Sequence, residues 1–237
     1  MARPVPLAAG VWRIPTLGSN LVNSFAFDEP DGSLTLVDTG YKGSGPKRLA
    51  AALEALGRRP DQVRRILLTH AHYDHAGGAA RVVAHTGAPI ATHTEEAEYL
   101  RQGRPPHYQG GNRLGRLLSL WQPKLQAAEV RSTFSDGELL DVAGGLRVLH
   151  TPGHTPGHCS FLHEPTGVLI TGDSLFNFRD RTSWSFAFFC TDPRMSRDTA
   201  DRLGDAQYEV AAFTHGPEMR DRARERVREF LRTHRRP

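Results

Sequence analysis

The chain has 237 residues, enough to bury a sizeable core as one large domain or two small ones. Its hydrophobic and charged fractions, 38% and 24%, are ordinary for globular proteins and argue against disorder. The formal net charge of +4 is modest, and much of the excess lies in residues 220–236, where a solvated amphipathic helix is favoured over a nucleic-acid contact.

The cysteines and the apolar segments bear on the compartment. Cys159 and Cys190 form no spaced disulfide framework, which is typical of a reducing compartment. The N-terminus lacks the long apolar core of a signal peptide, and no run of eighteen apolar residues predicts a membrane span. We therefore expect a cytoplasmic protein with no membrane contact. The sequence leaves the oligomeric state open, a homodimer included.

The first half of the chain alternates predicted strands and helices. Short runs rich in Val, Ile and Phe predict the early strands, and the turn pair Asp31-Gly32 separates two of them. We expect strands at 10–15, 21–27, 33–37, 63–68 and 89–92, and helices at 46–56, 79–85 and 94–100, the last capped by Thr94.

The second half begins with a change of pattern. Residues 101–126 contain Pro-Pro and Gly-Gly loop signals and then a helical pattern, so we expect a helical segment that covers a site. Beyond it we expect strands at 139–141, 146–150, 159–163, 168–171 and 209–214, an irregular stretch at 176–193, and helices at 196–203 and 218–233. Two strand-rich halves, each finished by helices, predict two sheets packed face to face with helices outside.

The stretch from His70 to His75 carries the strongest chemical signal. It follows an apolar strand and has the pattern H-x-H-x-D-H, so four potential metal ligands fall within six residues. In an extended segment the side chains of His70, His72 and Asp74 point to one side and that of His75 to the other. This arrangement is consistent with two adjacent ions. Zinc prefers imidazole nitrogen and carboxylate oxygen, so we interpret this stretch as a metal site at the end of a strand.

Three later strand ends carry similar side chains. His154 follows a Pro-Gly turn, and Asp173 and His215 each end a predicted strand. His150 and His158 flank His154, but the turn favours His154 as the ligand. Each position alone is weak evidence, whereas their order after H-x-H-x-D-H is strongly specific.

With this set of residues the sequence resembles the metallo-β-lactamase-fold hydrolases of the glyoxalase II and lactonase-like branch, from the early strands through Asp38 to His215. The resemblance implies an α/β fold, a four-layer αββα sandwich of two mixed β-sheets with helices on the outer faces, formed as a single domain over residues 1–237. It also implies two divalent metal ions, with zinc favoured and iron or manganese as alternatives. The implied ligands are His70, His72 and His154 for one ion, Asp74, His75 and His215 for the other, and Asp173 as a bridge between them.

The resemblance also implies an activity. Asp38 matches a carboxylate that supports a ligand histidine without binding metal. A hydroxide that bridges the two ions would attack an ester, thioester or lactone of a small-molecule substrate, and Asp74 would carry a proton to the leaving group. Asp173 argues against β-lactamase activity, because the β-lactamases of the family replace this acid by cysteine or usually lack it. Only 22 residues follow His215, which weakens the expectation of a glutathione thioester.

Two alternatives stay open. One is a relative of the persulfide dioxygenases with a single iron held by His70, His154 and Asp173. The other is a phosphodiesterase or nucleic-acid-binding member of the superfamily, which only the arginine-rich tail supports. For the substrate pocket we expect aromatic side chains, and the candidates are Tyr73, Tyr108, Trp121, Phe176, Phe178 and Trp184.

Overall fold

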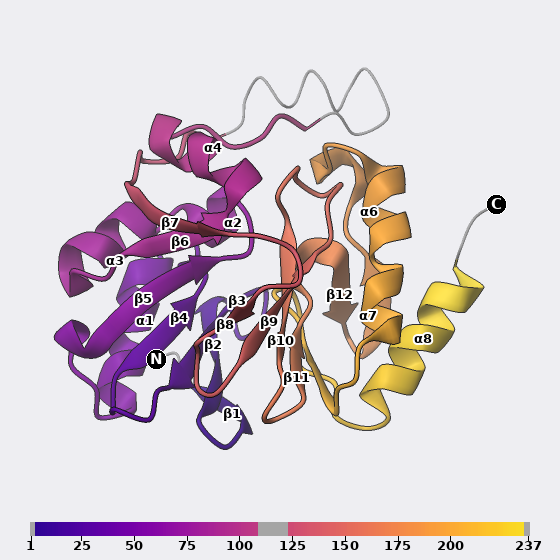
Figure 1. The fold of residues 1–237 in the computed structure, drawn as a ribbon, viewed down its shortest axis with the longest axis horizontal. Coiled ribbons are helices and arrows are strands. Elements are labelled where there is room, and N and C mark those ends of the chain that lie inside the picture. Colours follow the sequence, from indigo (N-terminus) through magenta and orange to yellow (C-terminus); the bar gives the residue numbers. More distant parts are fainter. Residues whose placement is uncertain (1–2, 109–122, 235–237) are drawn as a thin grey trace.

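Two mixed β-sheets pack face to face and carry helices on their outer surfaces, as the computed structural model shows for residues 3–108 and 123–234 (Figure 1). The predicted αββα sandwich is therefore confirmed. The first sheet has seven strands in the order β1 (Val5–Ala8), β2 (Val11–Leu17), β3 (Val22–Asp28), β4 (Leu34–Val37), β5 (Val63–Leu68), β6 (Ile90–His93) and β7 (Val130–Phe134). The second sheet has five in the order β14 (Val210–Ala212), β11 (Val168–Ile170), β10 (Cys159–His163), β9 (Leu146–His150) and β8 (Leu139–Leu140).

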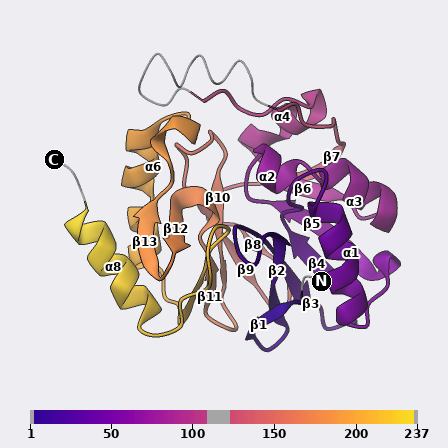
Figure 2. The same cartoon turned by 180° about the vertical axis from the view of Figure 1, so that it is seen from behind.

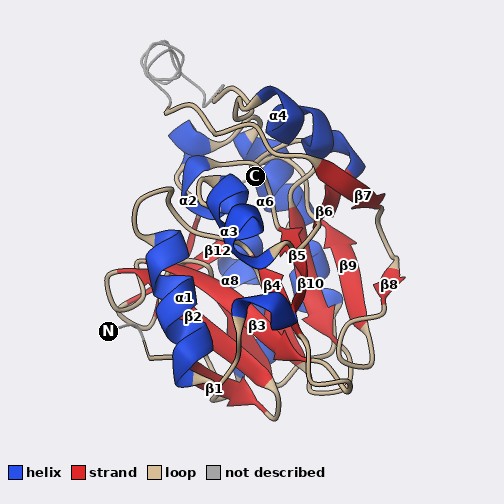
Figure 3. Ribbon diagram, turned by 90° about the vertical axis from the view of Figure 1, so that its left-hand side faces the viewer, coloured by secondary structure: helices blue, strands red, loops and turns tan. Residues whose placement is uncertain are grey.

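Helices of the described residues lie mostly outside the two sheets. They are α1 (Gly45–Ala55), α2 (Tyr73–Ala76), α3 (Ala79–Thr86), α4 (Ala97–Gln102), α6 (Pro193–Thr199), α7 (Asp201–Asp205) and α8 (Ala223–Thr233), with 3-10 turns η1 (Pro60–Gln62), η2 (Thr94–Glu96), η3 (Gly172–Ser174) and η4 (Ala187–Phe189). Helices α1 and α3 cover the first sheet (Figure 3), and α8 lies on the far side of the second sheet (Figure 2). No helix within residues 3–108 and 123–234 has the length and apolar character needed to cross a membrane.

Alternating strand residues explain the four layers. In β5, Ile66 and Leu68 pack against the helices α1 and α3, while Leu67 enters the core between the sheets. In β10, Phe161 lies between the sheets, while Leu162 belongs to the core beneath α8. Because successive side chains of a strand point to opposite faces, runs that are apolar throughout are buried on both faces.

The strand directions bring several carboxyl ends to one edge of each sheet. From β4 to β7 neighbouring strands of the first sheet are parallel. In the second sheet β14 is parallel to β11, and β9 runs the same way because both β9 and β11 are antiparallel to β10. The segments that follow β4, β5, β9, β11 and β14 contain Asp38 and all seven predicted ligands.

The structure corrects the expected irregular stretch at 176–193. Here β12 (Leu175–Phe178) and β13 (Arg181–Trp184) form a two-stranded antiparallel hairpin. Its two turn residues, Arg179 and Asp180, have φ angles of 53° and 58°, as a two-residue type I′ turn requires. Asn-Gly and Asp-Gly are the usual sequence signals for this turn, so the pair Arg179-Asp180 did not predict a hairpin.

Other boundaries also differ. The expected helix at 94–100 is the turn η2 followed by α4, and His93 rather than Thr94 caps it, because the His93 ring accepts the Glu95 N–H at 3.3 Å. Strands β1 and β7 were not predicted, the expected helix at 196–203 is divided into α6 and α7, and the last helix starts at Ala223. Most of the predicted cover, residues 101–126, lies outside the described residues.

Candidate metal centre

The predicted ligands converge where the ends of the two sheets meet. His70 and His72 lie in the loop after β5, and the single turn α2 carries Asp74 and His75. The other three follow β9, β11 and β14, and they are His154, Asp173 and His215. Five of the seven side chains are almost fully buried, whereas Asp74 and His215 keep 22% and 12% of their side-chain surface exposed.

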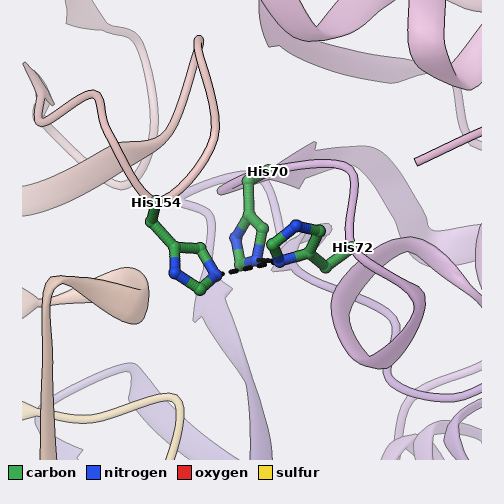
Figure 4. Close-up of side chains that lie close together, drawn as sticks. All are labelled: His70, His72 and His154. Atoms are coloured by element: carbon green, nitrogen blue, oxygen red, sulfur yellow. Dashed lines mark hydrogen bonds between the residues drawn. The ribbon is translucent and has the colours of Figure 1, made fainter. Parts of the chain in front are cut away.

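One group consists of three imidazoles. Nδ1 of His72 lies 3.1 Å from Nε2 of His70 and 2.9 Å from Nε2 of His154 (Figure 4). These ring nitrogens come from loops of different sheets, yet all lie within 4.8 Å of one another. Their separations suit three ligands around one ion.

A second group lies beside the first. Nε2 of His75 lies 3.3 Å from Nε2 of His215, and Oδ2 of Asp74 lies 3.5 and 3.4 Å from these two nitrogens. Asp173 stands between the groups: its Oδ2 is 3.2 Å from Nε2 of His154, and its Oδ1 is 3.3 Å from Nε2 of both His75 and His215. One carboxylate thus reaches both groups with different oxygens.

Each of these imidazoles points one ring nitrogen into the cluster. In four of the five rings, the other nitrogen contacts a second protein group. The second contacts are Nδ1 of His70 to Thr69 Oγ1 (3.0 Å), Nδ1 of His75 to Asp38 Oδ2 (2.9 Å), Nδ1 of His154 to Cys190 Sγ (3.6 Å) and Nδ1 of His215 to the Leu21 carbonyl (2.6 Å). Within the described residues, Nε2 of His72 is buried without a hydrogen-bond partner. Metal-binding histidines usually show such an outer partner, which fixes the ring orientation.

The buried charges favour a cation. Burial lowers the pKa of His70 and His72, so both are neutral. Burial raises the pKa of Asp173, but the imidazoles of His215, His75 and His154 lower it more, well below its ordinary value. Burial lowers the pKa of His154 and His215, but the Asp173 carboxylate and other neighbours raise these values to about 9 and about 10. The protons on His154 and His215 therefore occupy positions that a divalent ion would take. The nitrogen and carboxylate donors of the cluster are those that zinc prefers.

The flanking histidines have different surroundings. His150 stacks on His93 with ring centroids 4.1 Å apart and an interplanar angle of 15°. His158 is fully buried: its Nε2 accepts the Asp173 N–H at 2.7 Å, and its Nδ1 lies 2.9 Å from the Thr151 carbonyl. A Cβ at Gly172, where φ is +53°, would lie 2.4 Å from that Nε2, so only glycine allows this approach. His158 therefore fixes the backbone at Asp173, a role the sequence did not indicate.

A cavity of about 300 Å³ opens onto the cluster. Four predicted aromatic residues line it: Tyr73, Tyr108, Phe176 and Phe178. Three unpredicted ones, Tyr41, Phe186 and Phe189, lie beside them. Trp121 lies outside the described residues.

Trp184 does not lie among the described residues that line the cavity. Its ring packs against Phe230 of α8 at a centroid distance of 5.1 Å, with the Arg197 guanidinium 5.8 Å from the ring centre. It faces this helix because the pairing of β12 with β13 sets its side of the hairpin, and the hairpin was not predicted. Within the described residues, Trp184 therefore belongs to the packing of α8 and not to the cavity wall.

The chain matches the family model of the metallo-beta-lactamase superfamily over residues 17–215. It belongs to this superfamily. Hydroxyacylglutathione hydrolase GloC of Haemophilus influenzae is 34% identical over 136 residues, which are 56% of this chain and 58% of that protein. An N-acyl homoserine lactonase of Bacillus thuringiensis is 29% identical over 168 residues, covering 66% of this chain and 56% of the lactonase.

Among solved structures, a metallo-beta-lactamase family protein from Thermus thermophilus superposes with a TM-score of 0.70 at 28% identity. The superposition covers 97% of this chain and 80% of that protein. The resemblance inferred from the ligand pattern is thereby confirmed at the level of family and fold. This chain spans little more than half the length of the two curated relatives named above.

Proposed function

We propose that this chain is a dinuclear metallohydrolase that cleaves an ester, thioester or lactone bond of a small molecule. His70, His72 and His154 would hold one ion, and Asp74, His75 and His215 the other, with Asp173 shared. When bound, two divalent ions would lower the pKa of a water molecule between them and polarise a substrate oxygen.

The observation that carries this proposal is the position of Asp173. Its two oxygens face different ligand groups at 3.2 and 3.3 Å, as a bridging carboxylate must. A single-ion centre would leave Oδ1 of this buried carboxylate, together with Asp74, His75 and His215, without a metal. The geometry therefore supports two ions over one.

Asp74 suits a role in proton transfer. It lines the cavity and keeps part of its surface exposed. Burial raises its pKa, but His75 and His215 lower it more, well below its ordinary value. The carboxylate is therefore ionised, and its position at the cavity, rather than its basicity, supports a role in passing a proton to the leaving group.

The cavity supports a substrate with an apolar part. Aromatic rings form most of its wall, and the described residues that line it include no lysine or arginine. A hydrolase for a strongly anionic thioester would need cationic groups to hold the carboxylates of its substrate. Of the two reactions that the names of these relatives give, hydrolysis of a lactone with an apolar acyl group fits this cavity better, and an apolar ester would fit in the same way.

A substrate panel tests the proposal. Purified protein would be assayed with matched lactones, thioesters and phosphodiesters, beside His72→Ala and the surface control Asp61→Asn, whose side chain is 70% exposed. We expect turnover of a lactone or an apolar ester, a loss of more than about 100-fold in His72→Ala because a ligand itself is removed, and no loss in the control. Oxygen consumption on a persulfide with one bound iron, or turnover of phosphodiesters alone, would contradict it.

A further inference from the structure

Glu96 is a fully buried carboxylate that is neither a predicted ligand nor part of the cavity wall. It is the last residue of η2 and directly precedes α4. Glutamate side chains are rarely buried completely unless they have partners, because a charge or a polar group loses its hydration there. The contacts of Glu96 therefore need an explanation.

Both carboxylate oxygens accept hydrogen bonds from backbone amides. Oε2 accepts the Ala71 N–H at 2.7 Å, and Oε1 accepts the Gly157 N–H at 2.7 Å. Ala71 lies between His70 and His72 in the loop after β5 of the first sheet. Gly157 lies in the loop between β9 and β10 of the second sheet, three residues after His154. One side chain thus joins the two loops that carry the three-imidazole group.

The contact between Glu96 and the amide of residue 157 also requires a glycine at that position. A Cβ at position 157 would lie 2.8 Å from Cγ of Glu96 and 2.9 Å from Nδ1 of His93. Glycine is therefore required for the amide of residue 157 to approach the carboxylate. The absence of a side chain at Gly157 is thus what allows Glu96 to accept its N–H.

We propose that Glu96 is a positioning residue for the metal centre. By holding Ala71 and Gly157 at a fixed separation, it sets the distance between His72 and His154, whose ring nitrogens lie 2.9 Å apart across the same two loops. Zinc binds imidazole nitrogen at about 2.0–2.1 Å, so a small shift of one loop weakens the ligand set. The inference rests on the proposed function, since it assumes that these imidazoles hold an ion.

Glu96→Gln is the sharpest variant. Glutamine has nearly the same shape, but its amide nitrogen only donates, so one of the two N–H groups would face a second donor. We expect the affinity for Zn²⁺, measured by competition with a chromogenic chelator, to fall by about 10–100-fold. The visible spectrum of the Co²⁺-loaded protein should change as well. Glu98→Gln is the matched control, because that side chain lies two residues further on and is 66% exposed.

Gly157→Ala breaks the same contact from the opposite loop and should lower the affinity in the same way. Urea unfolding of each metal-free variant separates positioning from stability. Reduced affinity in a variant that is still folded supports the proposal, and if Glu96→Gln does not fold, Gly157→Ala and the shorter Glu96→Asp decide. Unchanged affinity and an unchanged Co²⁺ spectrum, with or without a loss of stability, would overturn it. A wild-type protein that binds no zinc would instead contradict the proposed function itself.

Discussion

Oδ2 of Asp38 lies 2.9 Å from Nδ1 of His75, and both side chains are fully buried. The same carboxylate accepts the Thr69 N–H at 2.8 Å and contacts the Thr69 hydroxyl. The backbone of Asp38 has a φ of +62°, an unusual value outside glycine that an aspartate or asparagine tolerates better than most residues. Asp38 therefore orients the imidazole of His75 and joins the ends of β4 and β5.

Replacing Asp38 with Asn should weaken metal binding. The amide keeps the shape and tolerates the positive φ, but it removes the negative charge that polarises His75. We expect the affinity for the more weakly held ion to fall by about 10–100-fold, as measured by chelator competition. The exposed variant Asp61→Asn serves as the control, and equal affinities in the two variants would show that the Asp38 charge does not act on the centre.

Metal binding should release protons at neutral pH. The pKa values of about 9 and about 10 for His154 and His215 mean that both imidazoles carry a proton in the metal-free protein at a pH of about 7.5. An ion must displace these protons, because only neutral imidazole binds metal. Titration calorimetry in buffers of different ionisation enthalpy measures this release, and heats that do not depend on the buffer would contradict the prediction.

The same two histidines predict how the stability of the metal-free protein varies with pH. Their folded-state pKa values lie above the unfolded value of about 6.5, so their contribution is complete below that pH and is lost as the pH rises through 9 to 10. Urea unfolding between about pH 7 and 10 should show falling stability without metal and a flatter profile with metal. A metal-free profile that is flat or rises would be inconsistent with this assignment.

Phe178 and Trp184 allow a crossed comparison on one hairpin. Phe178 lines the cavity and is only partly buried, so Phe178→Ala should raise KM for an apolar ester by about tenfold, since a lost hydrophobic contact of this size is worth about 1–3 kcal/mol. Its effect on the free energy of unfolding should be small. Steady-state kinetics on matched apolar and polar esters measures the shift, and an equal KM for the variant and the wild type would exclude Phe178 from the substrate site.

Trp184→Ala should show the opposite pattern. Its packing against Phe230 predicts a loss of about 3 kcal/mol in the free energy of unfolding. KM and kcat should stay close to the wild-type values, because the described part of the cavity wall does not include this residue. A raised KM without a loss of stability would show that Trp184 contacts the substrate.

Part of the clustering of the candidate ligands was predictable from the sequence, because each of them lies in a segment that follows a predicted strand. Carboxyl ends of parallel strands meet at one edge of a sheet, and this rule brings Asp173 after β11 close to His215 after β14. The approach of His70 from the other sheet was implied by the family resemblance and not by the strand pattern. The αββα layering was predictable for a related reason, since runs such as Ile66-Leu67-Leu68 are apolar on both faces of a strand. Local pattern and global fold agree at these positions.

The surroundings of Glu96 and Trp184 could not be predicted from the sequence, because they depend on contacts between remote segments. Glu96 follows another glutamate at the start of a helix, where an exposed side chain is the usual outcome, and its burial arises from two loops distant in sequence. Trp184 is one of several aromatic residues in one stretch, and only the pairing of β12 with β13 decides which of them face α8. Local propensity carries no information about either contact.

Counting bound ions in the wild type and in Asp173→Asn shows whether the centre holds two ions with Asp173 shared between them. Elemental analysis after zinc loading and removal of free metal should give two ions per wild-type chain and at most one in the variant, since Asp173 reaches both ligand groups. Hydrolytic turnover, followed during zinc titration of the metal-free protein, should rise until the second equivalent is added. Full activity with one bound ion, or two ions retained by Asp173→Asn, would rule out a dinuclear centre that shares Asp173.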